Sequence, residues 1–492
     1  MFDNGKDIAM RSLIVTAFLG ALLAAGTSAA LAFSADAGPL VDTFPLTLVP
    51  GQRTEVLGPL YFSQDSQNDH TWGLPPFFSY RRNPDPDLDV EEYDVLYPVL
   101  THSRYGRQYR WQLFQLFSFA GGLTQTETNR SRFTIFPIYF QQRSSDPAEN
   151  YTALFPIYGR VLNRLYRDEV FFVVFPLYSK TRKRDVVTEN YVYPFFHLRE
   201  GNGLRGWQFF PLVGHETKEI TQVTNRYGDV LTSPGHENFF ALWPIYYHNH
   251  FGLGTTNAGV NHAVLPAYAV MRSPLRDQTT YLWPFFSVID DRERKYKEWE
   301  MPWPFIVIAR GEGKNTTRFW PFYAHAEGKD GVLETLSILG PVYRYNRLTS
   351  SPLDRERSRI LYFLYTDVKE RNMQTQAQRT RRELWPFFIK RKDWDGSTRL
   401  QLLALLEPLL PVNRSIERNW SPVWSIWRDE KNATTGASSQ SLLWNLYRNE
   451  HTPESKKCSL LFGLFQYQKD SGGKRVRLFY VPLGKGTSSN KQ

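Results

Sequence analysis

Short apolar runs alternate with short polar stretches along the whole chain. One run, "ELWPFFIKRK" at 383–392, places a proline among aromatic residues with basic residues directly after them. Proline removes a donor from a β-ladder and breaks a helix, so this run alone is a poor strand and a poor helix. Because the same shape recurs many times, it predicts a repetitive architecture rather than a single site.

The repeat reads aromatic or leucine, proline, apolar, aromatic, and then polar and often basic residues. Its cleanest copies begin at Trp283-Pro284, Trp303-Pro304, Trp320-Pro321 and Trp385-Pro386. The proline-containing copies centre on Pro59, Pro76, Pro98, Pro137, Pro156, Pro176, Pro194, Pro211, Pro244, Pro266, Pro284, Pro304, Pro321, Pro341, Pro386, Pro408, Pro422 and Pro482. Copies of the same shape without proline centre on Gln115, Phe363, Asn445 and Gly463. Together they are about 22 copies with a period of roughly 20 residues.

Polar turn signals lie between the copies. They include "GNG" at 201–203, "GKDG" at 328–331, "DWDG" at 393–396 and "DSGG" at 470–473. Glycine accepts the positive φ that tight turns need, and connections this short join antiparallel neighbours. With β-branched and aromatic residues in the runs and no helical period, the pattern predicts an all-β chain. We expect a long antiparallel meander of about 22 similar strands, each centred on one copy.

Two stretches show clean alternation between the faces of a predicted strand. Trp420, Pro422 and Trp424 would share one face, and Trp444 would share a face with its neighbours at 442 and 446. This alternation follows from the two-residue period of a strand. It is typical of a sheet with two different faces.

Three architectures fit the meander. The expected one is a large closed β-barrel with aromatic girdles, in which each motif proline sits mid-strand at a bulge. The alternative is a soluble stack of β-hairpins, as a solenoid or propeller, in which each proline marks a corner and all polar tips point one way. A large β-sandwich, with the motif filling its core, is the third.

The N-terminus predicts export. Met10 and Arg11 precede the apolar run "LIVTAFLGALLAAG", and Ala30-Leu31-Ala32 fits a cleavage site, so residues 1–32 read as a signal peptide; an uncleaved anchor helix is the alternative. The pattern leaves open whether the start is Met1 or Met10. We expect a short extended lead at 33–58, one repetitive β domain at 59–484 and a polar tail at 485–492.

Composition narrows the class of protein. With 41% hydrophobic and 22% charged residues, the chain is neither disordered nor a helical membrane protein. The net charge of +10 favours anionic partners, and export makes outer-membrane lipid or lipopolysaccharide the expected one and nucleic acid an unexpected one. The pattern leaves small-molecule or glycan cargo open. Cys458 is the only cysteine, so no internal disulfide is expected.

The sequence carries no nucleotide-binding, hydrolase or zinc-protease motif, so we expect no enzyme activity and no cofactor. His248 and His250 share a predicted strand face and are weak metal candidates, although a polar strand end is the better interpretation because no carboxylate or cysteine accompanies them. Basic residues after the motif, such as Arg344, Arg391 and Lys392, would line a lumen, meet phosphates or simply be solvated.

The leading functional hypothesis is an outer-membrane β-barrel of a Gram-negative bacterium that acts as a plug-free channel or an envelope scaffold. The longest interval between copies, from Pro211 to Pro244, is the best candidate for a loop that narrows such a barrel. The alternative is a periplasmic or secreted β-repeat protein that binds polyanions or carbohydrate through aromatics and basic strand ends.

Overall fold

The computed structural model describes residues 40–483 apart from 86, 88, 124–128, 225–227 and 412. The predicted signal peptide at 1–32 and tail at 485–492 lie outside the described residues, as does the beginning of the predicted lead. The described residues form 45 strands, and strand content is 61% against 4% helix. The prediction of an all-β antiparallel meander is confirmed.

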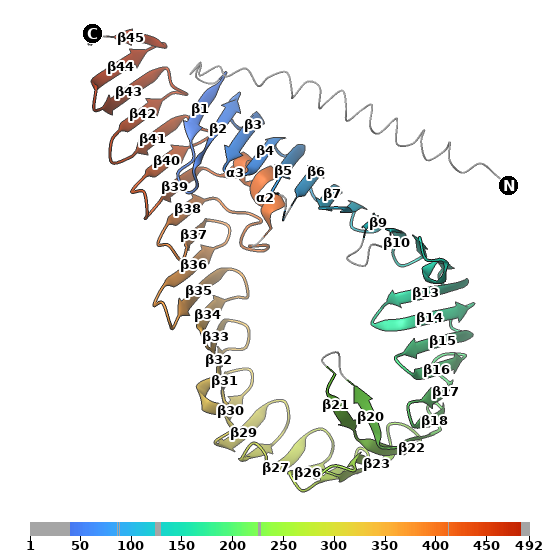
Figure 1. The fold of residues 1–492 in the computed structure, drawn as a ribbon. Coiled ribbons are helices and arrows are strands. Elements are labelled where there is room, and N and C mark those ends of the chain that lie inside the picture. Colours follow the sequence, from blue (N-terminus) through green and yellow to red (C-terminus); the bar gives the residue numbers. More distant parts are fainter. Residues whose placement is uncertain are drawn as a thin grey trace, which may run out of the picture.

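The strands follow one another along the chain in Figure 1. The first group is β1 (Asp42–Pro45), β2 (Gly51–Val56), β3 (Tyr61–Ser66), β4 (Asp69–Leu74), β5 (Phe78–Asn83), β6 (Val90–Val95), β7 (Leu100–Tyr105), β8 (Gln108–Leu113), β9 (Phe117–Leu123), β10 (Asn129–Ile135), β11 (Tyr139–Ser144), β12 (Tyr151–Leu154), β13 (Tyr158–Arg164), β14 (Arg167–Val173) and β15 (Tyr178–Lys183). The second is β16 (Val186–Tyr191), β17 (Phe196–Gly201), β18 (Leu204–Phe209), β19 (Val213–Lys218), β20 (Thr221–Thr224), β21 (Val230–Ser233), β22 (Gly235–Ala241), β23 (Tyr246–Leu253), β24 (Gly259–Val264), β25 (Tyr268–Arg272), β26 (Arg276–Tyr281), β27 (Phe286–Asp291), β28 (Tyr296–Glu300), β29 (Ile306–Gly311) and β30 (Lys314–Phe319). The third is β31 (Tyr323–Gly328), β32 (Leu333–Ile338), β33 (Tyr343–Ser350), β34 (Leu353–Ile360), β35 (Tyr365–Asn372), β36 (Gln378–Leu384), β37 (Phe388–Lys392), β38 (Thr398–Leu402), β39 (Trp427–Lys431), β40 (Ser438–Leu442), β41 (Tyr447–His451), β42 (Lys456–Leu460), β43 (Phe465–Asp470), β44 (Gly473–Leu478) and β45 (Val481–Leu483). Short 3₁₀ turns lie at Gly58–Leu60, Pro147–Glu149 and Lys329–Gly331, and two helices, α2 (Arg414–Asn419) and α3 (Ser421–Trp424), interrupt the series between β38 and β39.

A single sheet contains 43 of these strands, and each is hydrogen-bonded antiparallel to its sequence neighbours. The remaining pair, β20 and β21, forms a separate hairpin between β19 and β22, which pair directly with each other. Among the described strands, β1 pairs only with β2 and β45 only with β44. Strands β1 and β2 belong to the sheet although they lie within the stretch predicted as an extended lead.

The expected strand number of about 22 is wrong because the motif forms turns instead of strands. In the copy at Pro284 the amide of Phe285 donates to the carbonyl of Leu282 over 3.0 Å, and in the copy at Pro321 the amide of Phe322 donates to the carbonyl of Phe319 over 2.9 Å. These bonds close β-turns with proline at the third position, and most motif prolines follow a cis peptide bond. Each copy therefore joins two strands, which have three to eight residues each. The motif proline lies at a corner between strands, as in the alternative architecture, and not at a bulge in the middle of a strand.

Two sequence predictions of strands around tryptophan are also wrong. The stretch containing Trp420 and Pro422 is helical: the Asn413 side chain caps α2 by accepting from the amide of Ile416 over 3.2 Å, and Pro422 lies in the first turn of α3, where its missing donor is harmless. Residues 443–446 form a turn. Within the described residues, no helix is long and apolar enough to cross a membrane.

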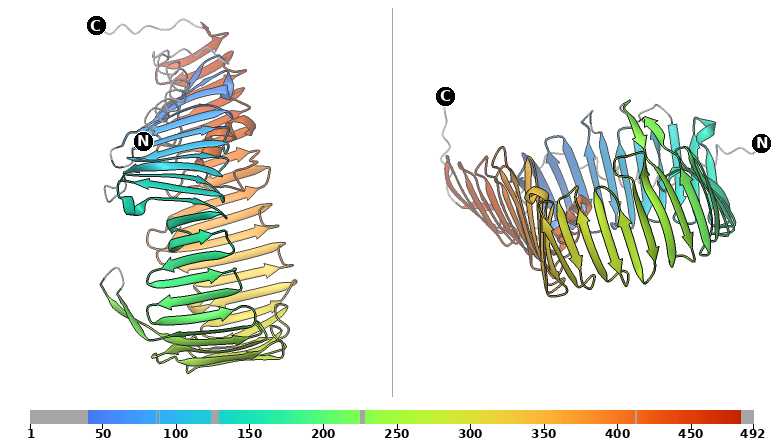
Figure 2. Two further views of the ribbon diagram at one scale, coloured as in Figure 1. Left: turned by 90° about the vertical axis from the view of Figure 1, so that its right-hand side faces the viewer. Right: turned by 90° about the horizontal axis from the view of Figure 1, so that it is seen from below.

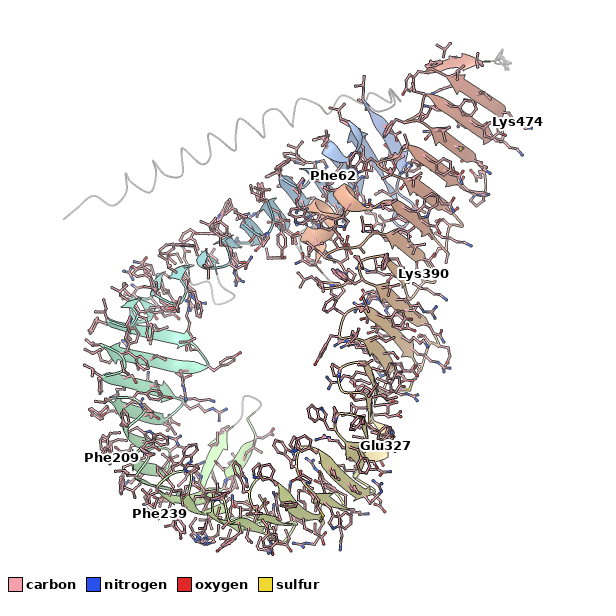
Figure 3. All side chains as sticks on the ribbon, turned by 180° about the vertical axis from the view of Figure 1, so that it is seen from behind. Phe62, Phe209, Phe239, Glu327, Lys390 and Lys474 are labelled. Atoms are coloured by element: carbon pink, nitrogen blue, oxygen red, sulfur yellow. The ribbon has the colours of Figure 1, made fainter. Side chains whose placement is uncertain are left out.

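The sheet is one layer thick and curls into a ring (Figures 1 and 2). Motif turns form one edge of this band, which we call the proline edge, and the polar connections form the other, the polar edge. The inner face is the one that meets α2: Arg391 of β37 pairs with Glu417, and Arg418 pairs with Asp94 of β6. Figure 3 shows the same division, with Phe62 inside and Phe209 outside the ring.

The curvature follows from the sizes of the residues on the two faces. Alanine, glycine and serine are frequent on the inner face, where Ala153, Ala263 and Ala309 are fully buried. Gly159 lies directly opposite Ala153, and a Cβ there would come within 2.2 Å of the Ala153 backbone. The outer face carries large aromatic residues in the corresponding positions. A sheet with bulky side chains on one face and small ones on the other bends toward the small ones, because close packing tolerates few voids.

The two ends of the sheet meet at a seam, where β1–β6 lie against β38–β43 and the helices fill the space between them (Figure 1). The Arg418 guanidinium donates to Asp94 over 2.7 Å, and the Asn445 amide donates to Glu55 over 2.6 Å. The Arg448 guanidinium stacks 3.3 Å above the ring centroid of Phe44. These side-chain contacts therefore join the two ends of the sheet.

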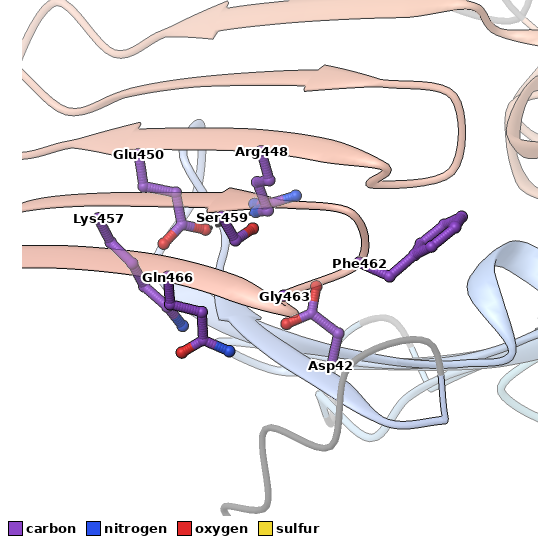
Figure 4. Close-up of a pocket in the computed structure, with 8 residues that line it drawn as sticks. All are labelled: Asp42, Arg448, Glu450, Lys457, Ser459, Phe462, Gly463 and Gln466. Atoms are coloured by element: carbon purple, nitrogen blue, oxygen red, sulfur yellow. Dashed lines mark hydrogen bonds and ion pairs between the residues drawn. The ribbon is translucent and has the colours of Figure 1, made fainter. Parts of the chain in front are cut away.

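Figure 4 shows the seam where Asp42 of β1 approaches Arg448, Glu450 and Lys457 of β41 and β42. The Arg448 guanidinium pairs with Glu450 over 2.6 Å. The pocket between these residues has a volume of about 10 Å³, which suffices for roughly one water molecule. This part of the seam is thus packed, whereas a hollow of about 300 Å³ lies elsewhere along it, lined among others by Arg53, Arg399 and Arg428.

The hairpin β20–β21 occupies the longest interval between motif copies, where a loop was expected. It leaves the band at the polar edge (Figure 2) and leans toward the middle of the ring in the view of Figure 1. It pairs only with itself among the described strands.

Candidate functional site

A continuous row of apolar side chains runs around the outer face directly beside the proline edge. It consists of the residues that flank each motif turn, which pair across neighbouring strands. We call it the outer apolar row: Phe78, Val95, Leu100, Leu113, Phe117, Ile135, Tyr139, Leu154, Tyr158, Val173, Tyr178, Tyr191, Phe196, Phe209, Val213, Ala241, Tyr246, Val264, Tyr268, Tyr281, Phe286, Ile306, Phe319, Tyr323, Ile338, Tyr343, Ile360, Tyr365, Leu384, Phe388, Leu402, Trp427, Leu442, Tyr447, Leu460, Phe465 and Leu478. The row exists because every motif copy places apolar residues on both sides of its turn.

The turns themselves add further exposed apolar residues at the proline edge. Phe322 and Phe387 are 67% and 64% exposed, and Trp283, Trp303 and Trp320 are also exposed. Apolar area of this extent around a whole edge is far larger than the patches that monomeric proteins ordinarily leave in water. The structural repeat that the sequence singled out therefore forms a surface, which we call the rim: the motif turns together with the outer apolar row.

The rim is shallow. A strand rises about 3.3 Å per residue, so the turns, the outer apolar row and the next outward-facing position span about 10 Å. That next position is apolar in many strands of the first three quarters of the band, for example at Trp207, Phe239 and Ile308, and polar in later ones, as at Asp367 and Lys390. The following outward position is mostly charged. The outer face thus changes from apolar to charged over a few residues.

Aromatic residues before the motif prolines stack on one another along the edge. The ring centroids of Phe155 and Phe175 are 5.4 Å apart, and those of Phe175 and Tyr193 are 5.8 Å apart. The turns are also linked through the backbone, since the amide of Trp283 donates to the carbonyl of Pro266 over 2.8 Å. The rim is therefore a connected surface in which neighbouring aromatic side chains pack against one another.

An apolar hollow lies on the inner side of the rim, across β11–β16. Its volume is about 400 Å³, and it is lined by the aromatic side chains of Phe140, Phe155 and Phe172. Asn190 and Arg167 supply polar groups at its margin. A hollow of this size and lining is within the range of small-molecule sites.

The predicted residues of the repeat motif all lie on the rim. Trp283, Pro284, Trp303, Pro304, Trp320, Pro321, Trp385 and Pro386 occupy motif turns. The Trp385 indole donates to the carbonyl of Leu405 over 2.9 Å, so one edge of this ring is tied to the loop that leads toward α2. Basic residues after the motif divide between the faces: Lys390 points outward (Figure 3) and Arg391 inward to Glu417.

The histidine candidates lie on the outer face of β23 and β24. Nε2 of His248 is 3.1 Å from Nε2 of His250, and its Nδ1 is 3.3 Å from Nδ1 of His262. Because His248 meets its two neighbours through opposite ring nitrogens, these three imidazoles do not converge on one point. Among the described residues, no group of three or more His, Cys, Asp or Glu side chains is arranged to hold a metal ion.

The inner face pairs charges between neighbouring strands. Lys314 contacts both carboxylate oxygens of Glu298, at 2.9 and 2.7 Å, and Arg399 pairs with Glu430 over 3.2 Å. Burial, together with the nearby Arg399 and Arg53, lowers the pKa of Arg428 to about 10. The sequence pattern did not indicate this inner charge, because arginine and glutamate at these positions also suit a solvated strand.

No protein-family model matches the chain, and no curated protein was found to match it.

Proposed function

We propose that the protein is an exported envelope scaffold that rests on a lipid bilayer by its rim. The observation that carries this proposal is the continuous ring of exposed aromatic and aliphatic side chains along one edge of a single sheet. Tryptophan and tyrosine favour the membrane interface, where an apolar ring body meets a polar boundary. The predicted signal peptide and the basic net charge are consistent with an anionic membrane surface outside the cytoplasm.

The dimensions of the strands favour a scaffold over a channel. A strand that crosses a bilayer needs about 9–11 residues and an apolar band about 25 Å tall. The strands here have three to eight residues, and the apolar band is about 10 Å tall. This depth matches insertion into part of one leaflet, comparable to the 5–10 Å burial of interfacial helices.

Ring closure is part of the proposal. The expected barrel would close by hydrogen bonds between its first and last strands, whereas we propose that this ring closes through the side chains of the seam. Support comes from the contacts of Arg418 with Asp94 and of Asn445 with Glu55 across the two ends of the sheet. A closed ring places the whole proline edge on one side (Figure 2), so that many turns can reach the same lipid surface together.

Vesicle flotation tests the proposal. Full-length protein without the predicted signal peptide is mixed with phosphatidylcholine vesicles, whose net charge is zero, and centrifuged through a density gradient. The wild type is expected to float. Replacing Phe285, Phe322 and Phe387 with Asp should reduce the partition coefficient by more than about 100-fold, because each aromatic side chain contributes about 1.5–3 kcal/mol when buried.

The matched control carries the same three added charges at the polar edge, at Tyr166, Val332 and Trp394, of which Tyr166 is 97% exposed. It should float like the wild type. Equal loss in both variants, or a wild type that stays with the soluble fraction, would contradict the proposal. If the wild type sediments as a dimer and only the rim variant is monomeric, the rim binds a second copy and not lipid.

A further inference from the structure

Arginines gather on the inner face of β33, β34 and β36, away from both the rim and the seam. Arg344 of β33 lies directly opposite Arg359 of β34 in the strand register. Arg357 lies two residues from Arg359 on the same face, and Arg355 two residues further. Residues opposite each other across two strands have Cβ atoms about 5 Å apart, and like charges in that arrangement repel each other.

Carboxylates compensate only part of this charge. On this face, Glu370 pairs with Arg355 over 3.2 Å and Glu383 pairs with Arg381 over 3.1 Å. The other three arginines of the cluster form no ion pair within the described part of the chain. Burial raises the pKa of Glu383 above its ordinary value, although Arg381 opposes this effect. The free arginines therefore keep a net positive field toward the interior of the ring.

Arg357 is a partly buried member of the cluster without an ion pair. Its Nε atom is buried, and no hydrogen-bond partner for it lies among the described residues. Its strand neighbours in the register are Asn346 and the buried Val368, so no acidic residue lies directly opposite it, although the nearby Glu370 partly offsets its charge. Burial lowers the pKa of Arg357, and the nearby Arg355 and Arg359 lower it further.

Many other cations of the inner face are paired with a carboxylate. Arg276 pairs with Asp291, Lys314 with Glu298, and Arg448 with Glu450. Each of these cations thus has a carboxylate partner, which Arg344, Arg357 and Arg359 lack within the described residues. An uncompensated group of three guanidinium groups lowers stability, and proteins keep such groups where a ligand supplies the missing charge.

We propose that Arg344, Arg357 and Arg359 form a binding site for a phosphate-bearing ligand. Guanidinium groups present planar, paired donors that match the oxygens of a phosphate group, and several of them together favour a multiply charged anion. The phosphate can belong to a soluble polyanion or to a lipid headgroup, and the shared chemistry is a phosphate with two or more negative charges.

The test measures thermal unfolding and isothermal titration with pyrophosphate, at an ionic strength held constant with sodium chloride. Wild-type protein is expected to bind pyrophosphate and to unfold at a higher temperature in its presence. The double variant Arg357→Gln, Arg359→Gln should bind at least 10-fold more weakly. In the absence of ligand it should also unfold at a higher temperature than the wild type, because the repulsion is removed.

The matched control is Lys369→Gln, Arg382→Gln, which removes the same charge from the outer face of neighbouring strands. It should retain binding. Equal weakening in both double variants, or a pyrophosphate effect no larger than that of sodium chloride, would overturn the proposal. So would a cluster variant with lower stability and unchanged affinity.

A second arm distinguishes the two sources of phosphate. Vesicles that contain phosphatidic acid compete with pyrophosphate only if a headgroup can reach the inner face, whereas a site for soluble polyanions is unaffected by them. Flotation on phosphatidylcholine vesicles should be the same for the cluster variant and the wild type. A failure of this proposal is therefore separate from a failure of the rim to bind lipid.

Discussion

The seam and the open arc of the ring use the same kinds of polar contact over very different sequence distances. In the arc, Lys314 reaches Glu298 on a nearby strand, 16 positions away in the chain. At the seam, Arg418 reaches Asp94, which is 324 positions away. Contacts of the first kind hold nearby hairpins in register, whereas contacts of the second kind join the two ends of the sheet.

This difference has a physical consequence. The arc would keep its strand pairing if the ring opened, because its hydrogen bonds run only between neighbours. Among the described strands, none pairs across the two ends at the seam, which relies on a small number of buried polar groups. Asp94 is 3% exposed and Asn419, which also donates to it, is fully buried. Overall shape should therefore be more sensitive to substitution than local structure.

Removing Arg418 should have the largest effect. Arg418→Met leaves Asp94 buried without its cation and leaves Glu92 with Arg81 alone, and breaking a buried pair in this way costs about 3–5 kcal/mol. We expect the ring to open, with a larger radius of gyration in small-angle X-ray scattering and little change in far-ultraviolet circular dichroism.

The arc provides the matched control. Lys314→Met removes the partner of Glu298, whose side chain is almost fully buried, and should lower the unfolding temperature without changing the radius of gyration. If both variants have the same radius, or if Arg418→Met loses its β-structure altogether, the seam and the arc do not differ as described.

A smaller effect is expected at the other side of the seam. Asn445 has a φ of 66°, so glycine is the replacement that keeps the turn. Asn445→Gly removes the hydrogen bond to Glu55, which retains its 2.7 Å contact with Arg53. Loss of one partner of a buried hydrogen bond costs about 1–3 kcal/mol, so urea should open the ring at a lower concentration. Unchanged sensitivity to urea would show that this contact does not contribute to closure.

Low pH should weaken the contacts of the seam. Above pH 4, we expect this effect to be smaller than the effects of Arg418→Met and Asn445→Gly. Burial alone would raise the pKa of Glu92, but Arg418 and Arg81 hold it below its ordinary value. A carboxyl group with a depressed folded-state pKa contributes stability that is fully present above its unfolded pKa and is lost as pH falls through the folded value. The radius of gyration should therefore grow as pH falls below about 4.5, the ordinary value for Glu. Arg418→Met should lack this step; opening as pH rises would contradict the assignment.

The sequence predicted the repetitive part of the fold because each unit carries its own turn signals. The period of about 20 residues, the polar tips and the antiparallel order are all local features. The predicted number of strands was wrong because each motif proline was placed at a bulge in the middle of a strand. The rule that proline avoids central strands already indicated a turn at these positions. Around Trp420 the alternation of tryptophan with small residues suggested a strand, while the signals for helix were the Asn413 cap and Pro422.

The rim could be predicted only in part. The motif aromatics were expected to form girdles or to fill a core, and the structure places Phe387 on the exposed edge. Which sectors of the band meet at the seam could not be predicted, because Glu55 and Asn445 follow the same local pattern as other polar residues. The arginine cluster was equally hidden, since it depends on which arginines share a face and a register across three hairpins.

The nearest-neighbour construction of the band has a consequence for how such molecules can change size. Each hairpin is a supersecondary unit that contacts mainly the units before and after it, so its addition or deletion leaves the others intact. The circumference of the band then depends on the number of hairpins. Duplication of the gene segment for one hairpin would increase this circumference by a fixed amount. The joint at Arg418 and Asp94 sets the only condition that such growth must meet, because the last units must still return to the first.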